Sequence, residues 1–204
     1  MTHLYEALSW TIDEPERPLE FVIHNDGEVL ANVTRVAVRR PDDTGLPYAD
    51  PHAQNDLSRT LLCVMDPHAT PYFYVEHFSS MSGGYSPAVV VAPDGGRIGV
   101  VAVKSGGLKG AFELLTHRHR PKFSLRDAEG REVVLMVGPP MDNPFAEGEL
   151  RGPKGSEIGR FATRRSPHNE RRRQHTMRVH QALPEPARTL VLASLLGMEI
   201  VIPR

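Results

Sequence analysis

The sequence predicts a mainly β protein: a closed antiparallel β-barrel that encloses one hydrophobic C-terminal α-helix. Two features of the chain indicate this fold. A β run, a turn containing Gly and a second β run recur four times, and residues 189–202 (TLVLASLLGMEIVI) are apolar on every side of a helical wheel. A helix of that kind has to be buried. Closing the strands around it buries it and removes exposed sheet edges.

Each of the four repeated units predicts a β-hairpin. They span residues 21–30, 89–101, 122–135 and 148–161. Asp and Gly tolerate the positive φ angle that tight hairpin turns require. Side chains such as Phe123 and Leu125 alternate with polar neighbours, which is typical of strands with one buried face.

Further elements are expected between these hairpins. Strands are predicted over residues 61–65, 72–78 and 176–182, with a Pro-bearing turn at 66–71. Residues 40–58 and 164–175 are polar, and we interpret them as loops, the first of them mobile.

The terminal helix is expected over residues 187–202, with Pro184 and Pro186 in or before its first turn. The apolar run of 14 residues is shorter than the roughly 17–25 that a bilayer span needs, so burial inside protein is expected. Gly197 is the weak point of this interpretation, because a helix ending there would leave 198–202 as a short strand. We favour one continuous helix.

Composition indicates an ordinary soluble globular protein, with 204 residues, 40% hydrophobic and 24% charged. The chain shows no linker between two cores, so residues 1–204 are expected to form one domain. Cys63 is the only cysteine, which excludes an internal disulfide and suits a reducing compartment. The N-terminal residues do not have the pattern of a signal peptide. We expect a cytoplasmic protein, and its Pro, Arg and Ala content suggests a bacterial genome.

The charge is distributed unevenly along the chain. Residues 1–103 carry 6 basic and 14 acidic residues, a net of −8, whereas 104–204 carry 18 and 11, a net of +7. A basic half suggests an anionic partner such as phospholipid head groups or nucleic acid. The alternative is that the two halves are electrostatic complements within one fold.

Several segments resemble the Tubby C-terminal-like superfamily, in particular its phospholipid scramblase and LURP-one-related branch. The resemblance is carried by residues 92–99, 126–130, 155–159 and 188–196, and it runs over about residues 72–204. It implies a barrel of about twelve strands threaded by the C-terminal helix. It also implies association with membranes or phosphoinositides. The acidic calcium segment of the scramblases and the acylated cysteine cluster of some members have no counterpart, so calcium-dependent scrambling is not expected.

A run of arginines is the strongest chemical feature. Arginine makes bidentate contacts with phosphate, and each basic residue near an anionic membrane contributes about 1 kcal/mol. The predicted ligand-binding residues form two clusters. The main cluster is Arg164, Arg165, Arg171, Arg172 and Arg173. The second cluster is Arg118, Arg120 and Lys122, and it joins the first if the loops that carry the two clusters meet at one end of the barrel. The alternative is that these basic residues belong to an ordinary solvated surface with no ligand.

Other site classes have weak support. His68 with His77, or His117 with His119, do not form a recognised metal motif, so no metal and no cofactor is expected. The arginine runs contain no interleaved aromatic residue, which disfavours nucleic acid. No catalytic residue is assigned, and enzyme activity is left open but disfavoured. We therefore expect a non-enzymatic module, peripheral at anionic membranes. The alternatives are a regulatory domain with an acidic protein partner, or an undetected enzyme.

Overall fold

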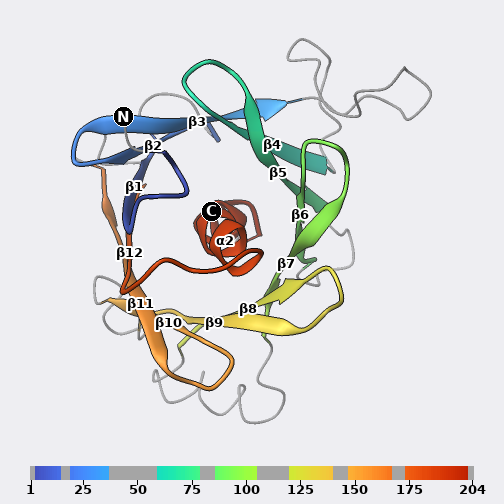
Figure 1. Ribbon diagram of the computed structural model, residues 1–204, viewed down its shortest axis with the longest axis vertical. Helices are drawn as coiled ribbons and strands as arrows, with labels where there is room; N and C mark the ends of the chain where they lie inside the picture. The colour runs from blue at the N-terminus through green and yellow to red at the C-terminus, as the bar shows by residue number, and fades with distance from the viewer. Residues whose placement is uncertain are drawn as a thin grey trace.

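The strands predicted from the hairpin pattern pair into one closed antiparallel barrel, with a helix along its interior (Figure 1). The computed structural model describes residues 3–14, 19–36, 59–78, 86–104, 120–139, 147–166 and 173–201. The elements are β1 (Ser9–Asp13), β2 (Phe21–Asn25), β3 (Glu28–Val36), β4 (Arg59–Met65), β5 (Pro71–Phe78), β6 (Ala88–Val91), β7 (Arg97–Val103), β8 (Lys122–Asp127), β9 (Glu132–Val137), β10 (Gly148–Arg151), β11 (Glu157–Arg165), β12 (Arg173–Val179) and α2 (Ala187–Val201). This confirms the predicted fold class.

All four predicted hairpin turns contain a glycine in the left-handed region. The φ angles are +85° at Gly27, +89° at Gly95, +84° at Gly130 and +78° at Gly155. These turns join β2 to β3, β6 to β7, β8 to β9 and β10 to β11. Residues that carry a side chain rarely adopt such φ angles without strain, so these glycines determine where the chain reverses.

Closure of the barrel depends on the pairing of β1 with β12, which places Trp10 opposite Met177. This pairing leaves no free edge in the sheet of described strands, as antiparallel closure requires. The first three strands therefore belong to the barrel wall.

Helix α2 fills the centre of the barrel, as Figure 1 shows. Leu190, Leu192, Leu195 and Leu196 are each 0% exposed. The helix continues through Gly197, which lies against Val101 and Ala88 of the wall, so the predicted continuous helix is confirmed. Among the described residues, no helix combines the length and the apolar character needed to cross a membrane.

The helix packs most closely against β5–β8. Small inward-facing residues on that side, such as Ala88 and Gly99, allow the close approach. Trp10, Phe21 and Phe161 fill the space on the opposite side, and each is at most 3% exposed. The indole Nε1–H of Trp10 donates to the carbonyl oxygen of Leu4 at 3.1 Å, which satisfies the buried donor.

The cysteine lies on the outer side of the wall, in a second apolar cluster with Leu61 and Tyr74. Cys63 is buried, as expected, and burial raises the pKa of its thiol to about 11. A thiol with this pKa is protonated near neutral pH, which suits a packing role and not a nucleophile.

The bounds of one predicted loop are wrong. Residues 164–175 were expected to form a loop, but β11 extends to Arg165 and β12 begins at Arg173. The ends of these two strands lie at one end of the barrel, where both the inner and the outer face of the wall accept polar side chains. The alternation of apolar and polar residues is therefore lost there. The predicted last strand, 176–182, also ends earlier, at Val179. The predicted mobile loop at 40–58 lies outside the described residues.

We predict that Leu192→Asp or Leu195→Asp prevents folding. An unpaired charge in a packed core costs several kcal/mol, a large part of the roughly 5–15 kcal/mol that stabilises a typical domain. Circular dichroism and the yield of monomeric protein would measure the effect. An unchanged melting temperature in either variant would show that the helix is not buried as described.

We also predict that Gly99→Ala lowers the free energy of unfolding by about 3 kcal/mol, because the new methyl group has no room. It would overlap the carbonyl oxygen of Arg126 and lie 3.0 Å from Cδ2 of Leu190. Gly96→Ala in the same hairpin is the control, since its nearest neighbour is the flexible side chain of Asp94 at 3.1 Å. Chemical denaturation of both variants tests this, and equal losses would contradict it.

Candidate anion-binding mouth of the barrel

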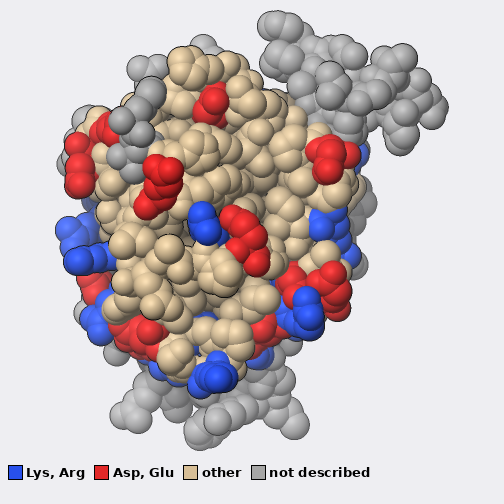
Figure 2. All heavy atoms as spheres, in the orientation of Figure 1, with Lys and Arg blue, Asp and Glu red and all other residues tan. Residues whose placement is uncertain are grey.

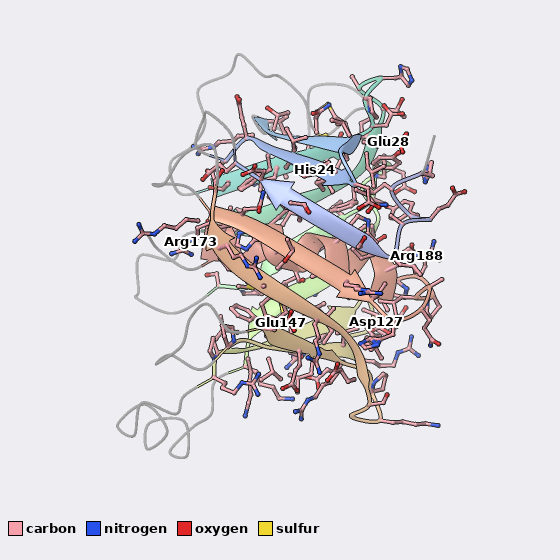
Figure 3. The ribbon with its side chains drawn as sticks, turned by 90° about the vertical axis from the view of Figure 1, so that its left-hand side faces the viewer. His24, Glu28, Asp127, Glu147, Arg173 and Arg188 are labelled. Carbon is pink, nitrogen blue, oxygen red and sulfur yellow. The ribbon has the colours of Figure 1, made fainter. Side chains whose placement is uncertain are left out.

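The predicted main arginine cluster lies at one end of the barrel, which we call the mouth. Here β11 ends and β12 begins, and Arg165 is directly opposite Arg173 across the two strands. Figure 3 shows Arg173 at this end and Asp127 at the opposite end. The four glycine-containing turns lie at that opposite end, which we call the hairpin end. Arg164, Arg165 and Arg173 are all exposed. Arg118, Arg171 and Arg172 lie outside the described residues.

The pleat of the strands divides the three arginines between two faces. Arg165 and Arg173 share the face of Thr163 and His175, which is the inner face of the barrel. Arg164 is opposite Gln174 on the outer face. The side chains therefore lie on both faces of the wall at the part of the rim formed by β11 and β12, and neither Arg164 nor Arg165 makes an ion pair with another described residue.

The second predicted cluster is at the same end but is partly neutralised. Arg120 precedes β8, three strands away from β11, which corresponds to about 14 Å. Its Nε donates to the carbonyl oxygen of Gly138 at 2.8 Å, and its Nη1 donates to Glu149 at 3.0 Å. Hydrogen bonds from Arg151 and Arg120 lower the pKa of Glu149, so this carboxylate stays charged and holds Arg120. Lys122 is half-buried at the start of β8.

A chain of hydrogen bonds lies inside the mouth, where α2 ends. The hydroxyl of Thr163 is 2.9 Å from Nδ1 of His175, and Nε2 of His175 is 3.0 Å from Oε1 of Glu199. The side chains of His175 and Glu199 are 1% and 2% exposed. Arg173 Nη1 is 3.4 Å from the same carboxylate oxygen. Glu199 therefore joins the end of the helix to β12 and neutralises part of the charge of Arg173.

Sequence reasoning did not identify this chain of hydrogen bonds. Glu199 is an acid within an otherwise apolar run, and this is the signal that would have indicated a buried partner at the end of the helix. Hydroxyl, imidazole and carboxylate groups also occur together in hydrolases. However, none of these three residues lines the groove that the outer wall of the barrel carries between β1 and β11.

Of the two histidine pairs weighed and disfavoured as metal ligands from the sequence, His68 and His77 are not brought together. His77 is buried near the end of β5, whereas His68 lies in the exposed turn before that strand. His117 and His119 are outside the described residues. Within the described ranges, no group of three or more His, Cys, Asp or Glu side chains is arranged to hold a metal ion.

The described ion pairs do not support the idea that the two halves of the chain neutralise each other. Arg59 pairs with Glu76 within the first half, and Lys104 pairs with Glu132 within the second. Arg160 and Glu157 are another pair within the second half. On the hairpin end of the barrel both signs of charge are interspersed around the rim (Figure 2).

Comparisons with known proteins give one structural likeness. No protein-family model matches the sequence, and no curated protein matches it significantly. Among solved structures, the X-ray structure of a protein from Arabidopsis thaliana matches with a TM-score of 0.48 and 11% sequence identity, covering 96% of this chain and 91% of that chain. The fold described above rests on the strand pairing of this chain itself.

We predict that Glu199→Ala lowers the free energy of unfolding by about 3 kcal/mol, because it leaves His175 buried without its acceptor. Glu199→Gln is expected to cost less, about 1 kcal/mol, since an amide oxygen still accepts a hydrogen bond. Urea denaturation measures both. Glu129→Ala is the control, because its pair with Arg131 is exposed and surface pairs contribute little. Equal effects of Glu199→Ala and Glu129→Ala would show that the buried pair adds no stability.

Proposed function

We propose that this protein is a non-enzymatic binding module, similar to the scramblase and LURP-one-related branch of the Tubby-like superfamily, that docks on anionic lipid head groups through its mouth. Docking would make it peripheral to a membrane surface, on the cytoplasmic side. A phosphorylated ligand free in solution shares this chemistry and is distinguished by the experiment below.

One observation carries the proposal: Arg165 and Arg173 are opposite each other across β11 and β12, with Arg164 beside them. Like charges directly opposite on neighbouring strands are destabilising. Of the three described arginines, Arg173 is the one that contacts the carboxylate of Glu199, at 3.4 Å. An anionic group at the rim removes the remaining repulsion and accepts bidentate hydrogen bonds from the guanidinium groups.

The position of the cluster also suits docking on a surface. The described arginines lie together where β11 ends and β12 begins, so they can reach a flat layer of head groups together. The interior of the barrel does not compete for this role, because the apolar helix fills it.

The test is sedimentation with neutral and anionic liposomes at low and high salt. We expect salt-sensitive binding to anionic vesicles only. The double variant Arg164→Ser with Arg165→Ser should bind about 30-fold more weakly, from about 1 kcal/mol per basic residue.

The matched control is Arg97→Ser with Lys154→Ser. It also removes two exposed positive charges, but from the hairpin end. Equal losses in the two double variants would refute docking by the mouth. Binding of soluble inositol phosphates without binding to vesicles would assign the site to a free ligand instead.

A further inference from the structure

The outer wall of the barrel carries a groove that lies apart from the mouth. It has a volume of about 880 Å³ and runs over β12 between β1 and β11. Figure 3 looks onto this wall, with Glu147 labelled. None of the predicted basic residues lines it.

Small side chains hollow the wall here. Thr11, Thr176 and Ala162 follow one another across the three strands in register. Their neighbours in the next row are Arg178 and Arg160, again directly opposite each other. The two long arginines therefore bound a shallow floor that carries two hydroxyl groups.

Two arginines, Arg160 and Arg178, and one carboxylate, that of Glu147, line the groove, so its lining has a net charge of +1. Nε of Arg160 donates to Glu157 at 2.8 Å, and its Nη1 donates to Glu147 at 3.4 Å. Arg178 is exposed and forms no ion pair with another described residue. Arg178 and Arg160 are like charges directly opposite each other across a strand pair, which is a destabilising arrangement. An anion bound beside the guanidinium of Arg178 would reduce their repulsion.

Three polar groups without described partners thus converge in the groove. The hydroxyls of Thr11 and Thr176 form no hydrogen bond with another described residue, and both line the groove with Arg178. At the rim, the side chain of Leu8 is an apolar surface, 43% exposed. The groove combines a cation, two groups that donate and accept hydrogen bonds, and an apolar contact.

We propose that this groove binds a short peptide segment that carries an acidic side chain. A single carboxylate matches the one uncompensated guanidinium in charge and in fork geometry. A dianionic phosphate would place excess negative charge near Glu147, which lines the same groove. Pockets of about 300–1,000 Å³ suit ligands larger than one small acid, and a peptide of a few residues has that size. The closed sheet has no free edge with which a peptide could pair, so the peptide is recognised through side chains of the groove, including the two hydroxyl groups.

The experiment is selection of a random heptapeptide phage library on the full chain, followed by fluorescence anisotropy with a selected peptide. We expect the selected peptides to share Asp or Glu. Their affinity should fall about tenfold or more for Arg178→Gln and also fall for Thr176→Val, which removes only a hydroxyl. Arg97→Gln is the matched control, an exposed arginine on β7 far from the groove, and it should bind as the wild type does.

Each other outcome overturns the proposal. Selected peptides without an acid would do so, as would equal binding to Arg178→Gln. A loss in Arg164→Ser with Arg165→Ser, but not in Arg178→Gln, would place the peptide at the mouth. Competition by free glutamate at the peptide's own concentration would make this a small-molecule site. Melting temperatures of all variants exclude misfolding, and Thr176→Val keeps the test valid if Arg178→Gln fails to fold.

Discussion

The structure depends on the need to fill the interior of a wide barrel. Eight strands enclose a space that inward side chains can fill by themselves, whereas twelve enclose more. Helix α2 occupies the excess, and it is apolar on all sides because wall surrounds it on all sides. Gly99 and Gly197 permit the close contacts on one side, and aromatic residues such as Trp10 complete the packing on the other.

The filled interior limits where a ligand can bind to the barrel. A ligand cannot enter a lumen occupied by leucines that are 0% exposed. Where the helix ends, the buried carboxylate of Glu199 contacts His175 and Arg173. The two proposed binding surfaces therefore lie outside the interior, at the mouth of the barrel and on its outer wall, where Arg165 and Arg178 have no ion-pair partner among the described residues.

One hairpin, β11–β12, contributes to both surfaces. It carries two pairs of arginines in direct register, Arg165 with Arg173 at the mouth and Arg160 with Arg178 on the wall. In each pair one member has a carboxylate partner and the other has none among the described residues. The like charges repel each other in the free protein, and a bound anion would reduce that repulsion. The two proposed sites, one for a lipid head group and one for an acidic side chain, thus rest on the same electrostatics.

Local patterns in the sequence determined the hairpins and the helix. A left-handed turn needs a residue such as Gly130, and an apolar run such as 189–202 must be buried, wherever the rest of the chain lies. The sequence also located the arginines, but not their partners. Closure by β1 and β12, the contact of His175 with Glu199 and the groove beside Arg178 join residues that are far apart in the chain. Only the tertiary structure decided these features, because strand register and burial are set by contacts between segments and not by the composition of any one segment.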